Sequence, residues 1–257
     1  MSEEFIKPVA YDEIAPRYDV ARPVGRRDEG IWVDLASDFI DPNDTVLDLG
    51  CGNGRWIIPF AERLNCHGIG ADNSLEMLRL AKNNDAHHLV QWSLQDAEYL
   101  SFQDNSFDAV WISHLLHLVQ DPIAVTKECF RVLRQDGRIL LRYTSLEDNL
   151  RMPERQFFPG LIGIDTRRIP PKENVTKWLT SAGFNIVSRA VCVQVYDSAI
   201  ERLEKARMRV ESGLTKLMDE QFRDGIEAFA QYVNEKGNET WLLNDNYVFT
   251  VGLKVAR

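Results

Sequence analysis

A glycine-rich segment, DLGCGNG at residues 48–54, joins a short apolar run at residues 45–49 to a stretch with helical spacing at residues 55–64. Glycine has no Cβ, so glycines at alternate positions let the backbone turn tightly and approach a ligand closely. The helix that follows offers free N–H groups and a partial positive charge at its first turn. A strand, a tight turn and a helix in this order predict an open α/β sheet, and such sheets bind ligands at the carboxyl ends of their strands.

The alternation of apolar runs and helical patterns continues along the chain as far as residue 143. The expected strands are residues 45–49, 67–71, 89–93, 107–113 and 138–143. The expected helices are residues 30–40, 55–64, 74–83 and 122–133. Because the connections are short, this alternation predicts right-handed crossovers and a parallel, doubly wound sheet.

The rest of the chain is less regular. Residues 145–170 contain several prolines and predict a partly helical excursion, and residues 173–182 predict a helix that Gly183 closes. A β-branched run at residues 184–195 predicts a sixth strand, and residues 247–255 predict the last one. Residues 198–235 predict helices with a break near residues 213–217. Nothing resembles a linker between domains, so we expect a single domain.

Composition narrows the classes of function. Acidic residues outnumber basic ones by 39 to 30 over 257 residues, which argues against nucleic acid and anionic membranes as partners. No stretch approaches the roughly 18 apolar residues of a membrane-spanning helix, and the acidic start MSEEFIKPVAYDE is unlike a secretory signal. The four cysteines lack the spacing of a zinc site or a disulfide framework. We therefore expect a reduced, cytoplasmic protein that needs no metal. We also expect a monomer or homodimer that acts on a small molecule.

The spacing of the glycines separates two kinds of cofactor. The dinucleotide fingerprint G-x-G-x-x-G/A would place its third small residue at position 55, where the sequence has Arg55. The pattern D-x-G-x-G-x-G instead resembles motif I of the class I S-adenosylmethionine-dependent methyltransferases. In that family the glycine loop lies against the methionine and ribose parts of S-adenosyl-L-methionine. The resemblance implies cofactor contacts from Asp48, Gly50, Cys51, Gly52, Asn53 and Gly54.

The resemblance continues in the family's order. Asp72 ends the second strand, where the family's acidic residue accepts hydrogen bonds from both ribose hydroxyls, and Asn73 follows it. Ser74 suits the N-cap of the next helix, and Met77 lies where the family places an apolar residue beneath the adenine. Asp96, Ala97 and Glu98 are similar to the family's adenine-reading turn.

Two longer matches extend the resemblance over residues 45–143. Residues 100–110, LSFQDNSFDAV, are similar to the family's L-P-F-x-D-x-S-F-D-x-V, and residues 131–138, RVLRQDGR, match its R-V-L-K-P-G-G. The fold that this implies is α/β: a doubly wound, Rossmann-like, mostly parallel seven-stranded sheet with an antiparallel last strand and helical lid insertions. Residues 1–257 would form one methyltransferase domain, with a lid at 1–28, a cofactor-binding core at 30–144 and substrate-side insertions at 145–170 and 198–240.

The segment after the fourth strand should border the reacting methyl group. It contains Ser113, His114 and His117, and an imidazole there can take a proton from an oxygen or nitrogen nucleophile. Each histidine can equally be a hydrogen-bonded part of the scaffold. Tyr18 and Arg22 belong to a Y-D-x-x-R-P segment that resembles the family's N-terminal lid, in which Arg22 would pair with the methionine carboxylate. The alternative for Arg22 is an exposed, solvated side chain.

The acceptor pocket is less well specified. Trp56, Phe157, Phe158 and Trp241 are candidates to line it, although ordinary packing explains each equally well. Residues 198–235 can roof the active site or bury their apolar stripe in a dimer. The sequence thus predicts transfer of a methyl group from S-adenosyl-L-methionine to a small molecule. The alternatives are an NAD(P)-dependent oxidoreductase and a non-catalytic module that binds S-adenosylmethionine.

Overall fold

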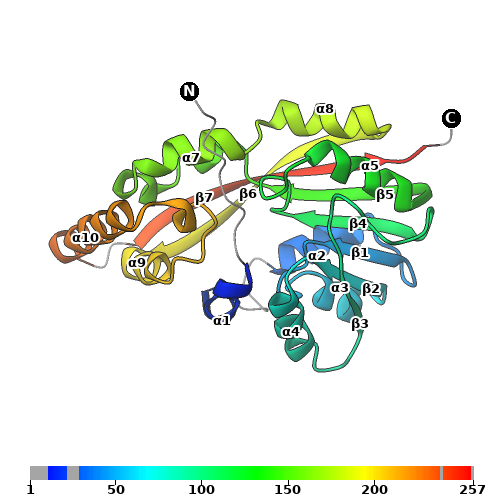
Figure 1. Ribbon diagram of the computed structural model, residues 1–257, viewed down its shortest axis with the longest axis horizontal. Helices are drawn as coiled ribbons and strands as arrows, with labels where there is room; N and C mark the ends of the chain where they lie inside the picture. The colour runs from blue at the N-terminus through cyan, green and yellow to red at the C-terminus, as the bar shows by residue number, and fades with distance from the viewer. Residues whose placement is uncertain (1–10, 22–28, 238–239, 256–257) are drawn as a thin grey trace.

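A seven-stranded sheet runs through the molecule (Figure 1). The computed structural model describes residues 11–21, 29–237 and 240–255. The strand order is β3-β2-β1-β4-β5-β7-β6. The strands are β1 (Thr45–Leu49), β2 (His67–Asp72), β3 (Val90–Leu94), β4 (Phe107–Ser113), β5 (Leu133–Tyr143), β6 (Asn185–Ser198) and β7 (Thr240–Leu253). Strands β1 to β5 pair in parallel, and β7 runs antiparallel to both β5 and β6. The predicted sheet with its antiparallel last strand is confirmed.

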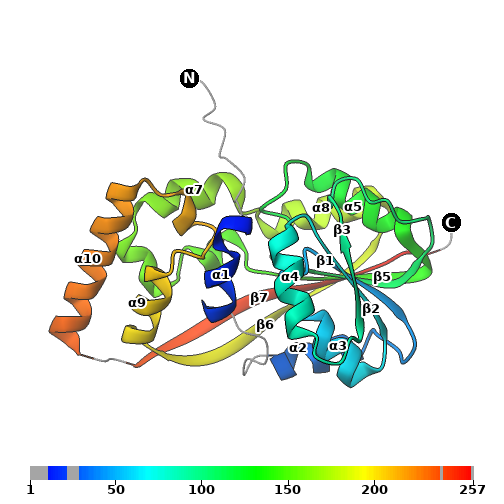
Figure 2. The same ribbon diagram turned by 60° about the horizontal axis from the view of Figure 1, so that its bottom comes forward.

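Alternating side chains of the central strands separate two apolar cores. Ala109 and Trp111 of β4 pack into one core, and Val110 and Ile112 of the same strand pack into the other. Helices α2 (Glu29–Ser37) and α3 (Ile57–Leu64) cover the first face, while α5 (Pro122–Val132) and α8 (Lys172–Ala182) cover the second. Figure 2 shows these two pairs of helices on opposite sides of the sheet.

A third apolar cluster lies away from the central strands. It joins Phe158, Leu161 and Phe229, and it is built from the insertions. Their elements are α6 (Leu146–Asn149), η1 (Pro153–Phe157), α7 (Gly160–Arg168), α9 (Ala199–Arg207), η2 (Leu214–Lys216) and α10 (Asp219–Lys236). In both ribbon views α7, α9 and α10 gather at one end of the molecule, and β6 and β7 reach out to them. No helix in the described part of the chain is long and apolar enough to cross a membrane.

One further helix of the described residues lies between the core and the insertions. Helix α1 (Tyr11–Ala21) comes from the expected lid segment and packs beside α4 (Leu75–Asn84), which connects β2 to β3. Figure 2 shows α1 between α4 and α9. Helix α1 is therefore placed at the boundary between the core and the insertions.

The predicted start of the last strand, residue 247, is wrong by seven residues. Strand β7 begins at Thr240 and pairs with β6 through to Ser198, so both strands are longer than their sequence patterns indicate. Residues 244–246 read NDN, residue types that are rare in strands, and only the partner strand holds them extended. Strand β5 likewise begins at Leu133, but its register against β4 jumps from Leu133 to Arg138. Residues 134–137 thus form an irregularity inside the strand, with Asp136 at φ 63°.

Candidate functional site

One cavity of about 990 Å³ lies at the carboxyl ends of the parallel strands, between the core and the insertions. This is the edge at which open α/β sheets bind ligands. Many residues singled out from the sequence come together here. Those that line the cavity are Tyr18, Gly50, Gly52, Asp72, Asn73, Met77, Asp96, Ala97, Glu98, Ser113, His114 and His117. Asp48, Cys51, Asn53 and Gly54 are not among the lining residues, and Arg22 lies outside the described residues.

Two glycines of the loop after β1 have different structural roles. Gly54 has φ 81°, and a Cβ there would lie 2.8 Å from both Ile58 Cδ1 and Trp92 Cη2, so its lack of a side chain serves packing. Gly52 has φ 54°, lines the cavity, and has no heavy atom within 4 Å of a Cβ position. The space that a side chain would take at Gly52 is therefore open, which suits a ligand lying against the backbone.

The carboxylate of Asp72 connects this loop to the next strand. Its Oδ2 accepts a hydrogen bond from the Gly52 amide at 2.9 Å, and its Oδ1 accepts one from the Ser74 amide at 2.9 Å. Burial raises the pKa of Asp72, and the amide hydrogen bonds partly offset that effect. Each carboxylate oxygen can accept a second hydrogen bond. Asp72 is thus held rigidly at the cavity with acceptor capacity left for a vicinal diol.

Ser74 connects α4 to α1. It caps α4 as predicted, because its Oγ accepts a hydrogen bond from the Met77 amide at 3.1 Å. The same hydroxyl donates to Asp12 Oδ1 at 2.5 Å, and the Glu76 amide donates to that oxygen at 3.2 Å. These two hydrogen bonds lower the pKa of Asp12. Helix α1 is therefore fastened by one carboxylate to the first turn of α4, beside the cavity.

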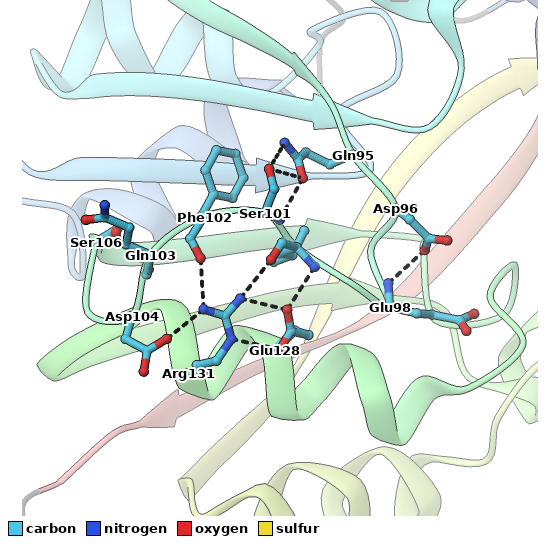
Figure 3. Close-up of polar contacts among 11 residues, drawn as sticks. Gln95, Asp96, Glu98, Ser101, Phe102, Gln103, Asp104, Ser106, Glu128 and Arg131 are labelled. Atoms are coloured by element: carbon cyan, nitrogen blue, oxygen red, sulfur yellow. Dashed lines mark hydrogen bonds and ion pairs between the residues drawn. The ribbon is translucent and has the colours of Figure 1, made fainter.

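The turn after β3 is fixed by its own side chains (Figure 3). Asp96 Oδ1 accepts a hydrogen bond from the Glu98 amide at 2.9 Å. Glu98 Oε1 in turn accepts hydrogen bonds from the amides of Gln120, at 2.6 Å, and Asp121, at 3.1 Å. These bonds hold the expected adenine-reading turn against the residues that precede α5.

Arg131 holds the loop that follows this turn. Its guanidinium donates to the backbone oxygens of Leu100, at 2.9 Å, and Phe102, at 2.8 Å. It also pairs with Asp104 and Glu128, each at 2.7 Å. Figure 3 shows the guanidinium between the loop and α5. The match to R-V-L at residues 131–133 gave no role to this arginine, and the structure shows that it ties two of the recognised motifs together.

Asp48 lies beneath the glycine loop and is fully buried. Neither carboxyl oxygen has a partner at hydrogen-bond distance among the described residues. Burial, and after it the nearby Asp72 carboxylate, raises the pKa of Asp48 well above its usual range. Asp48 does not line the cavity, so any effect of its side chain on a ligand there is indirect.

The two candidate catalytic histidines lie at the end of β4. His114 has φ 55°, in the left-handed region where non-glycine residues are uncommon, and its amide donates to the Arg142 carbonyl at 3.1 Å. His117 Nε2 lies 3.4 Å from Ser212 Oγ, in the segment between α9 and η2. Backbone strain at a cavity is a feature that clusters at functional sites. The structure thus places both histidines at the cavity and connects one of them to an insertion.

Two arginines at the cavity were not predicted as site residues. The Arg142 guanidinium lies over the rings of Tyr247, at 4.0 Å, and Trp32, at 4.7 Å. Arg55 and Arg142 lie 4.5 and 5.0 Å from the Trp56 ring. Both arginines are buried and both line the cavity. An arginine inside the apolar run ILLRY, residues 139–143, was the available signal for Arg142.

Among the aromatic candidates for the acceptor pocket, Phe158 lines the cavity. Trp56 instead packs against Trp32, and Phe157 and Trp241 both stack on Phe229. Helix α9 and the segment after it contribute lining residues, whereas α10 packs into the third apolar cluster. This part of the cavity is rich in charge. Its ionisable lining residues are Glu154, Arg155, Arg168, Glu201, Arg202, Lys205 and Glu211.

No group of three or more His, Cys, Asp or Glu is placed to hold a metal ion within the described ranges.

Comparison with known proteins relates the core of this chain to methyltransferases. Residues 47–141 match the family described as "Methyltransferase domain". Demethylmenaquinone methyltransferase of Streptomyces avermitilis is 34% identical over 134 residues, 51% of this chain and 57% of that protein. The C-methyltransferase UbiE of ubiquinone and menaquinone biosynthesis in Desulfotalea psychrophila is 34% identical over 154 residues, 58% of this chain and 62% of that protein. The chain thus spans about three fifths of the length of these relatives.

Solved structures share the fold over more of the chain. Phosphoethanolamine N-methyltransferase 2 of Haemonchus contortus, in complex with S-adenosyl-L-methionine, superposes with a TM-score of 0.62 at 16% identity. That match covers 95% of this chain and 57% of the other. The [4+2]-cyclase SpnF superposes with a TM-score of 0.65 at 18% identity, covering 96% of this chain and 95% of the other. At these identities the likeness concerns the fold.

Proposed function

We propose that this chain, which belongs to the class I S-adenosylmethionine-dependent methyltransferases, transfers the methyl group of S-adenosyl-L-methionine to a small-molecule acceptor. The observation that carries the proposal is the connection between Gly52 and Asp72. Both line the same cavity, the Gly52 amide is bonded to the Asp72 carboxylate, and the space above Gly52 is open. A ligand with a vicinal diol and a part that lies flat on the loop fits this arrangement.

The chain's contribution to binding follows from these positions. Asp72 would accept the ribose hydroxyls, Met77 would lie beneath the adenine, and the turn at residues 96–98 would read its edge. The open face of Gly52 would let the methionine part lie on the loop. Arg55 and Arg142 supply positive charge beside this loop, where a carboxylate is favoured over a cation.

The bound cofactor supplies a methyl group on a positively charged sulfur, and the leaving thioether is neutral. The protein therefore has mainly to align the acceptor with that methyl group and to exclude water. Helix α1 on one side and α9 on the other flank the cavity for this purpose. His117, held near Ser212, and His114 are the residues proposed to take the proton that an oxygen or nitrogen acceptor loses.

Calorimetry tests the proposal with three ligands: S-adenosylmethionine, S-adenosylhomocysteine and NAD. We expect micromolar binding of the first two and no binding of NAD. If NAD alone binds, the oxidoreductase alternative is correct. Methyl transfer from radiolabelled S-adenosylmethionine to a panel of acceptors then distinguishes an enzyme from a module that only binds the cofactor.

A further inference from the structure

The part of the cavity that the insertions line is rich in charged side chains. It lies outside residues 47–141, the segment that matches the methyltransferase family, so it is the part least defined by that match. We call it the charged chamber and define it by Glu154, Arg155, Arg168, Arg202 and Glu211, all of which line the cavity. If the cofactor lies on the glycine loop, this chamber remains available to the acceptor, so this inference rests on the proposed function.

Arg155 connects several of these charged residues. Its side chain is only 4% exposed, and its Nη2 lies 2.6 Å from Glu211 Oε1 and 3.0 Å from Asn149 Oδ1. The fully buried Asp165 lies behind it, with Oδ2 3.5 Å from the same nitrogen. Nη1 of Arg155 is buried and has no hydrogen-bond partner among the described residues. Nη1 of this buried guanidinium can thus still donate a hydrogen bond.

Glu154 can still accept a hydrogen bond. Its Oε1 is paired with Arg202, while its Oε2 is buried and has no hydrogen-bond partner in the described ranges. Arg168 completes the network, since it pairs with Asp165 at 2.8 Å and donates to Ser212 at 2.8 Å. Neighbouring residues of η1 therefore offer one unused donor and one unused acceptor at the same cavity.

The charges of the network balance. Arg155, Arg168 and Arg202 face Glu154, Glu211 and Asp165, which gives three of each sign. A purely apolar ligand in this chamber would leave the buried donor of Arg155 and the buried acceptor of Glu154 without a hydrogen bond, which is unfavourable. A ligand that carries both an anionic group and a hydrogen-bond donor would use Arg155 and Glu154 together.

We propose that the acceptor is a compact polar molecule that carries a carboxylate or phosphate close to an amino or hydroxyl group, bound by Arg155 and Glu154. Phe158 and Leu214, which also line the chamber, provide a limited apolar surface for its carbon skeleton. A polyprenyl chain, the apolar tail that a membrane quinone carries, is the acceptor feature that this chamber disfavours.

Calorimetry on the protein saturated with S-adenosylhomocysteine tests this with four probes. Phenylalanine carries both groups, 3-phenylpropionate lacks the amine, phenethylamine lacks the carboxylate, and a farnesyl-substituted naphthoquinone is apolar. We expect phenylalanine to bind at least about tenfold more tightly than each of the other three. Equal binding of phenylalanine and its single-group analogues, no measurable binding of phenylalanine, or tighter binding of the naphthoquinone would each overturn the proposal.

Variants assign the effect to the chamber. Arg155→Gln should remove the preference for phenylalanine over phenethylamine, whereas Arg151→Gln, at a 76%-exposed arginine of the same segment, should leave it intact. Equal effects of the two variants would contradict the assignment. If Arg155→Gln does not fold, Arg155→Lys keeps the charge but loses the two-pronged geometry and should weaken phenylalanine binding. Repeating the titrations without S-adenosylhomocysteine separates the two proposals: a phenylalanine preference in a protein that does not bind S-adenosylhomocysteine would refute the proposed function and leave the polar chamber standing.

Discussion

The Gly52 amide donates a 2.9 Å hydrogen bond to Asp72 Oδ2, across 20 positions of sequence. This bond joins the loop after β1 to the end of β2, so these two parts of the motif form one unit. A substitution at either residue therefore affects the other, and the following experiments separate direct contact with the cofactor from support of the loop.

Gly52→Ala should lower cofactor affinity because the added methyl group enters the open space that the cofactor would occupy. The positive φ should also cost about 1 kcal/mol of apo stability. Thermal melts with and without S-adenosylmethionine separate the effects, since wild type should gain about 2.7 kcal/mol at a hundredfold excess over the dissociation constant. Gly237→Ala is the matched control: φ is 71°, a Cβ has no heavy atom within 4 Å, and Gly237 is not a lining residue. A full ligand-induced shift in Gly52→Ala contradicts the assignment of the loop.

Asp72→Ala should weaken binding of S-adenosylhomocysteine by about 30- to 150-fold, or about 2–3 kcal/mol, because two hydrogen bonds to a charged group are lost. The variant should also melt at a lower temperature, since the Gly52 and Ser74 amides lose their acceptor. Asp85→Ala controls for that second effect. Asp85 is a buried carboxylate that likewise accepts from two backbone amides, those of Leu89 and Val90. We expect calorimetry to find unchanged affinity in Asp85→Ala. Equal losses in both variants would show that Asp72 acts only on the fold.

Asp12→Ala should release helix α1 from α4, because Ser74 and the Glu76 amide lose their shared acceptor. Hydrogen exchange of the peptide that spans α1 measures this, and Glu13→Ala removes an exposed carboxylate from the same helix as a control. The pKa of Asp12 is lowered by these bonds. A lowered carboxyl pKa stabilises docking above the unfolded value of 3.8, and this contribution is lost as the pH falls through the folded pKa. Protection of α1 in wild type should therefore decline below pH 3.8, and a pH-independent profile would argue against the Asp12 contact.

Asp48→Asn should stabilise the protein at alkaline pH. Burial raises the pKa of Asp48, so the folded form binds its proton more tightly than the unfolded form does. The resulting stability is present at low pH and is lost as the pH rises through the folded pKa. Asn carries no charge to bury, so the Tm advantage of the variant should be larger at pH 8 than at pH 5 and reach about 2–4 °C or more at pH 8. Asp108→Asn should lower the Tm at both pH values, because Asp108 accepts from Thr45 and pairs with Arg134. A Tm for Asp48→Asn below that of wild type at pH 8 would mean that the carboxylate has a stabilising partner.

Local sequence patterns were sufficient to predict the bounds of the central strands β1 and β4. Strands β1 and β4 have the predicted bounds, because short β-branched runs flanked by turn residues leave little choice of conformation. The cap by Ser74 was also predicted, since the residue and its partner are three positions apart. Such features depend on neighbours in sequence, which a single sequence displays.

Contacts between residues far apart in the sequence could not be predicted from local patterns. Asp12 and Ser74 are 62 positions apart, and Arg155 and Glu211 are 56 positions apart. Nothing in the local sequence distinguishes these charged residues from solvated ones, so the fastening of α1 and the charged chamber could not be predicted. The early start of β7 has the same cause, because residues of low strand propensity stay extended only through the partner strand.

Strand β7 pairs with β5 through residues 248–253 alone but with β6 over its whole length. The outer half of β6 and β7 is therefore a hairpin that projects from the sheet, and the connection between its two strands contains α9 and α10. Insertion or exchange at such a tip leaves the register of every inner strand untouched. In evolutionary terms, the hairpin tip of such a chain can be rebuilt while the edge proposed to bind the cofactor is inherited unchanged.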